Sequence, residues 1–98
     1  MKAEIFEHSV WVKCEDDFKL WQTLDGGIRT SGHTVLNQIN HDFEPQGSTA
    51  LWLLAESHLA MHTWPESQKA YVQISSCNEA KFNAFVAWLG EHTEVVEN

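Results

Sequence analysis

Apolar residues recur at every second position through most of this sequence, which is the period of a half-buried β-strand. The alternation predicts a first strand over residues 5 to 14 and, further along, four strands in succession. These four strands are expected over residues 34 to 41, 48 to 55, 58 to 64 and 70 to 77. Val35 and Ile39 fall on one side of the first of these four, and the Leu-rich run that follows fits a buried strand. Pro65 ends the strand before it, because proline cannot donate to a ladder.

Helical spacing replaces this alternation in two segments, the first of which begins at Asp16 and Asp17. Acidic residues in a first turn suit the helix dipole, which favours a helix start at this point. The apolar positions of the helix are Phe18, Trp21 and Leu24. We expect the glycine pair at 26–27 to weaken or end this helix before Ile28.

The second helical segment follows Asn78, which is a good N-cap residue. Its apolar residues fall at positions i, i+3, i+4 and i+7, the spacing of one helix face. They are Phe82, Phe85, Val86 and Leu89. Gly90 is placed to end the helix, and a short strand is expected at Val95–Val96.

The order of elements, namely strand, helix, four strands and helix, predicts an α+β fold. With tight connections, this order gives a two-layer sandwich with an antiparallel sheet and the helices on one face. A chain of 98 residues suits a single domain over 1–98. If Leu59 and Met61 pack under the helices, several reactive residues lie on the face that the helices leave uncovered. These are His62, Trp64, Gln73 and Cys77. Because a large exposed apolar patch is unusual on a monomer, we expect a ligand or a second protomer to cover this face.

The charge balance narrows the class of partner. Six Lys and Arg residues against 14 Asp and Glu residues give a net charge of -8, which argues against binding nucleic acid or an anionic membrane through a basic surface. No run approaches the ~20 apolar residues of a membrane-spanning helix, and the segment 1–4 does not open a signal peptide. We therefore expect a cytoplasmic protein. Cys14 and Cys77 are too few for a disulfide framework or a CxxC zinc site.

One short segment concentrates the reactive side chains. Residues 56 to 66 hold a serine, two histidines and two glutamates. His58 and His62 are ~13 Å apart along an extended strand, which is too far for one metal ion, so no metal site is expected. A Ser-His-Asp hydrolase is equally disfavoured, since Ser57 and His58 point to opposite faces and no Gly-x-Ser-x-Gly elbow is present. From residue types alone, a serine and two histidines at the rim of a sheet is the simplest interpretation.

The string from Ala55 to Glu66, AESHLAMHTWPE, closely resembles the signature of the small prokaryotic S-adenosylmethionine decarboxylases. These are pyruvoyl enzymes of polyamine biosynthesis. Upstream, the segment Phe43–Gly47 is similar to the Phe-x-Pro-x-Gly turn of that family. Downstream, Cys77 lies at the family's distance from the Glu-Ser-His triplet. The three motifs agree in register over residues 43 to 77, which makes the resemblance far more specific than any one motif.

The resemblance implies that the chain cuts itself between Glu56 and Ser57. The Ser57 hydroxyl would attack the preceding carbonyl, and elimination and hydrolysis would leave a pyruvoyl group that forms a Schiff base with the substrate amine. The family's processing histidine corresponds to His62, and a hydroxyl that supports processing corresponds to Thr49. Because Ser57 and His62 cannot share a face along one regular strand, a break near residues 56 to 58 is expected.

The same resemblance implies the remaining roles. Cys77 corresponds to the proton donor, and its thiol is mostly protonated at neutral pH. Recognition of the nucleoside would fall to Phe43, Trp64 and Glu66, through stacking on adenine and acceptance of the ribose hydroxyls. The expected assembly is a homodimer whose active sites borrow residues from the neighbouring subunit, with S-adenosylmethionine as substrate and neither metal nor PLP as cofactor. His58 has no assigned role. The other histidines are expected at the surface, namely His8, His33, His41 and His92.

Some departures from the family pattern leave alternatives open. Gln73 stands where a Val-Asp-x-x-Thr-Cys pattern usually has its acidic residue. The N-terminal strand lacks a Gly-x-His opening, and the chain stops before a basic ending, so a divergent and shortened member is expected. A decarboxylase acting on ornithine or arginine fits these departures as well. A non-catalytic paralogue that binds a nucleoside or an active decarboxylase is the other alternative to S-adenosylmethionine decarboxylation for spermidine synthesis.

Overall fold

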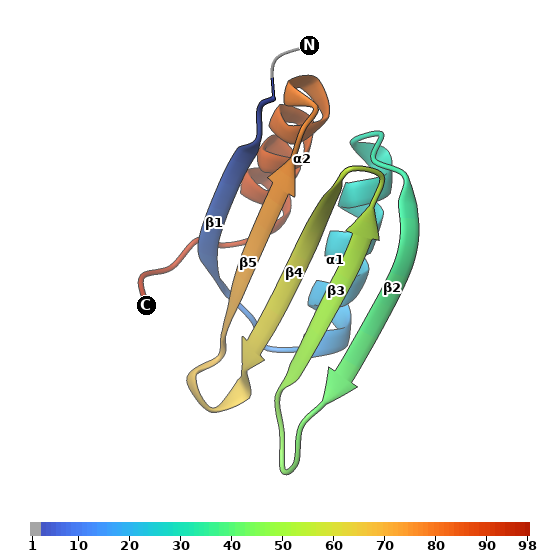
Figure 1. Ribbon diagram of the computed structural model, residues 1–98. Coiled ribbons are helices and arrows are strands. Elements are labelled where there is room, and N and C mark those ends of the chain that lie inside the picture. Colours follow the sequence, from blue (N-terminus) through green and yellow to red (C-terminus); the bar gives the residue numbers. More distant parts are fainter. Residues whose placement is uncertain (1–2) are drawn as a thin grey trace.

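Five antiparallel strands form one sheet, and both helices pack against the same face of it (Figure 1). This computed structural model describes residues 3–98. In chain order the elements are β1 (Phe6–Lys13), α1 (Asp17–Thr30), β2 (Val35–Asp42), β3 (Ser48–Leu54), β4 (Ser57–Trp64), η1 (Pro65–Ser67), β5 (Lys69–Ser76) and α2 (Glu79–His92). The strands lie in the order β1-β5-β4-β3-β2, and each neighbouring pair is antiparallel. The α+β two-layer sandwich expected from the sequence is confirmed.

The core lies between the sheet and the two helices. Alternate residues of the three central strands are buried beneath the helices: Ala50, Trp52, Leu54, Leu59, Met61, Ala70, Val72 and Ile74. From the helices come Leu20, Leu24, Ile28, Phe85 and Leu89. Burying each large apolar side chain stabilises the fold by about 1.5–3 kcal/mol. The strands bury only one side, which explains why apolar residues recur at every second position in the sequence.

The prediction that the glycine pair 26–27 could end α1 before Ile28 is wrong, because the helix continues to Thr30. Gly27 lies where α1 meets α2, and a Cβ atom added there would be 2.3 Å from the indole ring of Trp88. Glycine at this position therefore allows close packing of the helices. Its cost of about 1 kcal/mol in a helix interior is outweighed by burial of neighbours such as Ile28, which is completely inaccessible.

Helix α2 begins as predicted but ends later. The Asn78 side chain caps it by accepting a backbone N–H, whereas Gly90 lies inside the helix, which continues to His92. Beyond the helix, the short strand expected at Val95–Val96 is a single bridge that pairs Val95 with Val12 of β1. In the part of the chain that the structure describes, neither helix has the length and apolar character needed to cross a membrane.

A bulge in β2 changes which residues face the helices. Val35 pairs with Leu54 on the helix side, but the register shifts before Asn37, so the following residues alternate in the opposite sense. Ile39 consequently lies on the open face of the sheet and is 64% exposed. The prediction that Val35 and Ile39 share one side is therefore wrong.

Candidate active site

The turn between β3 and β4 carries an unfavourable backbone conformation. Glu56 has a φ of 66°, in the left-handed region that costs a residue with a Cβ atom roughly 1–2 kcal/mol. Ser57 follows directly and pairs with Leu54 as the first residue of β4. The Oγ atom of Ser57 is buried and has no hydrogen-bond partner among residues 3–98. A strained residue thus lies beside a hydroxyl that no hydrogen bond holds.

Cys77 lies at the same end of the sheet as this turn, directly after β5 (Figure 1). Its thiol donates a hydrogen bond to the Glu56 carboxylate, with 3.2 Å between Sγ and Oε2. This hydrogen bond, followed by desolvation, raises the pKa of the Cys77 thiol. The thiol is therefore held in its protonated form by the residue that precedes Ser57.

Thr49 and His62 form a hydrogen-bonded pair on the open face, toward the opposite end of the sheet. The two residues are cross-strand partners in β3 and β4, and 3.0 Å separates Thr49 Oγ1 from His62 Nδ1. The next strand places Tyr71 beside them, with 6.4 Å between the centroids of the His62 and Tyr71 rings. A hydroxyl therefore orients the imidazole within a row of open-face side chains.

A cavity of about 360 Å³ lies at one end of the sheet on the helix side, while a second cavity of about 340 Å³ lies beside the Thr49–His62 pair. The predicted nucleoside-binding residues Phe43, Trp64 and Glu66 all line the second cavity together with that pair. Trp64 is 43% exposed and packs against Trp11 at a centroid distance of 5.2 Å. The structure therefore brings together the three predicted binding residues and the predicted processing pair.

The loop between β2 and β3 forms one wall of the second cavity. The Phe43 N–H donates to the Gly47 carbonyl at 2.8 Å, which closes the turn expected from the Phe-x-Pro-x-Gly pattern. The Gln46 side chain donates to Glu66 at 3.3 Å. Phe43 itself stays half exposed, with its ring edge-on to His41. An aromatic face and a carboxylate are thus presented to the same space.

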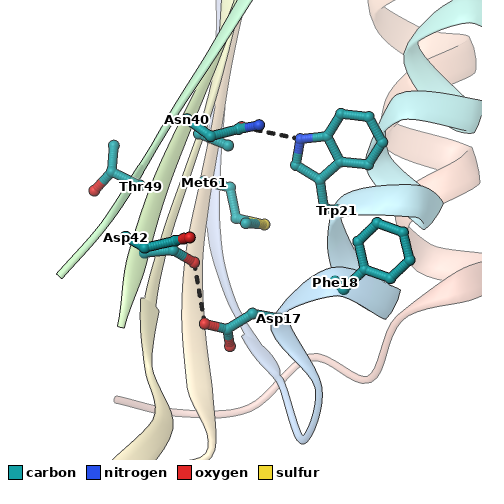
Figure 2. Close-up of a pocket in the computed structure, with 9 residues that line it drawn as sticks. Asp17, Phe18, Trp21, Asn40, Asp42, Thr49 and Met61 are labelled. Atoms are coloured by element: carbon teal, nitrogen blue, oxygen red, sulfur yellow. Dashed lines mark hydrogen bonds between the residues drawn. The ribbon is translucent and has the colours of Figure 1, made fainter. Parts of the chain in front are cut away.

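The first cavity separates α1 from the ends of β2 and β3 (Figure 2). Phe18 and Trp21 line it from the helix, and their rings are stacked with 6.3 Å between centroids. Trp21 donates to Asn40 of β2 at 3.1 Å, and Asp17 accepts a hydrogen bond from Ser48 at 3.0 Å. Hydrogen bonds between polar side chains that line this cavity therefore connect α1 to the sheet.

The predicted site residues fall into two groups at opposite ends of β4 (Figure 1). We call Glu56, Ser57 and Cys77 the turn-end group, and Phe43, Thr49, His62, Trp64 and Glu66 the loop-end group. The expected break is a turn that ends at Glu56, and Ser57 already belongs to the regular ladder. Ser57 therefore lies on the helix side of β4 and His62 on the open side, ~16 Å apart along the strand. One chain does not bring these two residues together.

Sequence reasoning missed two neighbours of the loop-end group. Trp11 and Tyr71 pack against each other at 5.2 Å and connect Trp64 to His62 across the open face. Both residues alternate with buried residues in the sequence, and this alternation is the signal that could have placed them on the open face. The place of Tyr71 beside His62 depends on the pairing of β4 with β5, and that of Trp11 beside Tyr71 on the pairing of β1 with β5; sequence periodicity reveals neither.

The expectation of a surface position is wrong for His33. Its side chain is buried, with Nε2 3.0 Å from the Ser76 hydroxyl and Nδ1 2.8 Å from the Ser31 hydroxyl. Burial lowers the pKa of His33, and the charge of Lys81 acts in the same direction. Among residues 3–98, no three His, Cys, Asp or Glu side chains gather closely enough to hold a metal ion.

Several further apolar residues lie on the open face. Leu51 and Leu53 alternate with buried residues of β3 and remain exposed, with 54% of Leu53 accessible. Ile39 of β2 is the cross-strand partner of Leu51. The open face therefore combines an apolar area on β2 and β3 with the aromatic residues around His62.

The five-stranded α+β sandwich defines the fold class of the chain, and comparison with known proteins identifies the family. The family model for S-adenosylmethionine decarboxylase matches residues 9–95, so the chain belongs to the S-adenosylmethionine decarboxylase family. A relative from Parasynechococcus marenigrum, named S-adenosylmethionine decarboxylase proenzyme, is 46% identical over 67 residues. The match covers 68% of this chain and 52% of that relative.

Two matches from Aquifex aeolicus, one in sequence and one in structure, extend the comparison. A proenzyme of the same name is 36% identical over 58 residues, covering 59% of this chain and 43% of the relative. The crystal structure of the adenosylmethionine decarboxylase from that organism matches with a TM-score of 0.70 at 24% identity, over 87% of this chain and 73% of that one. This likeness supports the fold. The chain spans about half the length of the curated relatives that it matches.

Proposed function

We propose that this chain is a pyruvoyl-dependent S-adenosylmethionine decarboxylase that matures by cleaving itself between Glu56 and Ser57. Its product would supply aminopropyl groups for spermidine synthesis in the cytoplasm. The observation that carries the proposal is the turn itself. Glu56 is held in a left-handed conformation, the adjacent Ser57 hydroxyl is buried without a partner, and the Cys77 thiol bonds to the Glu56 carboxylate.

Self-cleavage begins with an acyl shift. The Ser57 oxygen attacks the Glu56 carbonyl, an ester replaces the amide, and loss of the Ser57 Cα proton then breaks the ester by elimination. An unpartnered hydroxyl has no hydrogen bond to lose before it attacks. The unfavourable φ of Glu56 strains the intact chain, and strain at such sites amounts to roughly 1–3 kcal/mol. Because breaking the amide relieves this strain, the strain favours the acyl shift.

The base for the Cα proton comes from a second copy of the chain. Within one chain Ser57 and His62 lie ~16 Å apart along β4, which argues against proton transfer between them. A homodimer joined through the open faces would bring the turn-end group of one subunit to the partner's His62. The exposed apolar residues Ile39, Leu51 and Leu53 support such a contact, because homodimer interfaces are more apolar than the rest of a protein surface.

The turn end also suits the group that cleavage would leave there. A pyruvoyl group at position 57 would supply a ketone to hold the substrate amine and an acceptor for the electrons released with carbon dioxide. Cys77 keeps its proton at neutral pH because the Glu56 carboxylate raises the pKa of the thiol. That thiol then delivers a proton to the substrate carbon from which carbon dioxide has left.

The loop-end cavity is proposed to hold the nucleoside. Trp64 and Phe43 offer aromatic faces for adenine, and Glu66 offers a carboxylate for the ribose hydroxyls. Aromatic rings also attract the positive sulfonium, in keeping with a net charge of -8 on the chain. Gln73 lies between Ala60 and Ser9 on the open face and contributes a neutral amide to the sheet.

The mass of the purified wild-type chain tests this proposal. Incubation should yield fragments 1–56 and 57–98, the second with a blocked N-terminus that cyanoborohydride couples to S-adenosylmethionine. Ser57→Ala should remain whole, whereas Ser9→Ala, which removes an exposed hydroxyl from β1, should still cleave. Coupling to ornithine or arginine in place of S-adenosylmethionine would reassign the substrate. A wild-type chain that stays whole but binds a nucleoside would contradict the proposal and favour a non-catalytic paralogue.

A further inference from the structure

The Asp17 carboxylate joins the first turn of α1 to the strand ends beside the Thr49–His62 pair. Its Oδ2 atom accepts hydrogen bonds from the Thr63 hydroxyl at 2.8 Å and from the Ser48 hydroxyl at 3.0 Å. Figure 2 shows Asp17 pointing from the start of the helix toward the sheet, on the far side of the strands from Thr49. One carboxylate oxygen therefore holds the residue next to Thr49 in β3 and the residue next to His62 in β4.

Backbone pairing of β3 with β4 stops at the Thr49–His62 pair. The ladder begins at Leu54 and Ser57, and Thr49 opposite His62 is its last pair. One residue further on, a side-chain acceptor replaces the backbone acceptor, because the Ser48 N–H donates to the Thr63 hydroxyl at 2.8 Å. That hydroxyl accepts from Ser48 and donates to Asp17, so the direction of the hydrogen bonds is defined.

This arrangement links the two faces of the sheet. Because successive residues of a strand point to opposite sides, Ser48 and Thr63 face α1 while Thr49 and His62 face outward. Fixing the inner pair restricts the outer pair, which lies where a ladder otherwise frays. We propose that Asp17 is a positioning residue that holds the Thr49 hydroxyl and the His62 imidazole in register, a role in self-cleavage that rests on the proposed function.

Loss of the Asp17 carboxylate has a specific consequence. Without it the hydroxyls of Ser48 and Thr63 lose a shared acceptor in a partly buried site, and both must find new orientations. Asn at position 17 keeps one oxygen that can accept these hydrogen bonds, whereas Ala keeps none. Asp25 provides a matched control, because it lies on the same helix and accepts from Trp52 of β3 at 3.0 Å, away from the pair.

The first measurement is made in a Ser57→Ala background, in which the chain is expected to stay whole. Nitrogen NMR of the His62 ring reports the hydrogen bond between Nδ1 and the Thr49 hydroxyl directly. Asp17→Ala should shift the Nδ1 signal and lose this hydrogen bond, Asp17→Asn should restore most of it, and Asp25→Ala should leave it unchanged. Thr63→Val removes the same connection from the strand side and should match Asp17→Ala, which provides a second route if Asp17→Ala does not fold.

The second measurement is the rate of self-cleavage with Ser57 intact. Asp17→Ala should slow cleavage at least about tenfold, since small misplacements of reacting groups cost up to ~100-fold, and Asp17→Asn should recover most of the rate. An unchanged His62 ring signal and cleavage rate in Asp17→Ala and Thr63→Val, with only thermal stability lowered, would overturn the proposal. Failure of the wild type to cleave would contradict the proposed function alone, because the ring signal still decides the role of Asp17.

Discussion

The two ends of β4 carry different groups of reactive side chains. At the turn end are the strained Glu56, the buried Ser57 hydroxyl and the protonated Cys77 thiol. At the loop end are the Thr49–His62 pair and a cavity lined by aromatic rings and a carboxylate. Under the proposed function, the first end would supply a bond to cleave and an acid, and the second would supply a base and a place for a nucleoside. The proposed function needs both ends as two half-sites, so it requires that two copies of the chain combine.

The most direct test of this division combines two variants of the chain, each of which lacks one half-site. Ser57→Ala should abolish cleavage and His62→Ala should slow it strongly, because each removes one half-site. Co-expression of the two variants should restore cleavage of the His62→Ala chains, since a mixed dimer contains one complete site. With statistical pairing, about half of these chains should be cut at the wild-type rate, as read from the masses of differently tagged chains.

A single chain that contained the whole site would give a different result. Cleavage of the His62→Ala chains would then be no faster after co-expression than alone, even though mixed dimers were recovered by their two tags. That outcome would remove the argument from the distance between Ser57 and His62 along β4. A chain that cleaved normally at concentrations where it sediments as a monomer would contradict the shared site equally.

The two faces of the sheet also differ in their proposed roles, since the open face is the proposed dimer interface. A substitution on the open face should have the next largest effect. Leu53→Lys introduces a charge into the exposed apolar area of β3. Burying an unpaired charge costs about 2–5 kcal/mol, so dimer affinity should fall roughly 30-fold or more, while the monomer stays folded. Sedimentation measures the first effect and circular dichroism the second. Phe18→Lys is the control, because Phe18 is equally exposed but lies on α1; an identical loss of affinity there would argue against the open face as the interface.

On the covered face, one added methyl group should be harmful. Gly27→Ala places a Cβ atom 2.3 Å from the Trp88 ring, and relief of such overpacking typically costs about 1–3 kcal/mol. Gly26→Ala meets the same ring only at 3.9 Å and should be neutral or stabilise the helix by up to about 1 kcal/mol. Thermal denaturation compares the two. Equal stability of both variants would show that the helices can move apart at little cost.

These glycines illustrate what the sequence could predict about the fold. The strands follow from alternation because β3, β4 and β5 bury one side each, as at Leu59 and Met61. The role of Gly27 depends on where α2 crosses α1, and this is a tertiary contact without a local signal. The bulge in β2 is equally invisible to periodicity, since one extra residue reverses the faces of everything after it, including Ile39.

The candidate site was predictable in its members but not in its arrangement. The family resemblance named the members of both groups, and alternation placed Ser57 and His62 on opposite faces of β4. Sequence distance could not show that these residues would remain at opposite ends of a straight strand. Nor could it assign Asp17, whose importance arises because the β3–β4 ladder stops beside it.

The smallest expected effect concerns the Cys77 thiol at the turn end. Its pKa is raised because the thiol donates to the Glu56 carboxylate and the nearby negative charge disfavours a thiolate. Glu56→Gln, made in the Ser57→Ala background, should therefore lower this pKa, increase the thiolate fraction at a fixed pH, and speed alkylation by iodoacetamide a few-fold at pH 8. Glu66→Gln, at the loop end, should not change the rate. Cys14 provides an internal reference, since burial and Asp17 raise its pKa to about 12 and should keep it unreactive in both variants. Slower alkylation of Cys77 in Glu56→Gln would mean that Glu56 does not hold the proton on the thiol, and the proposed proton donor would then lack its support.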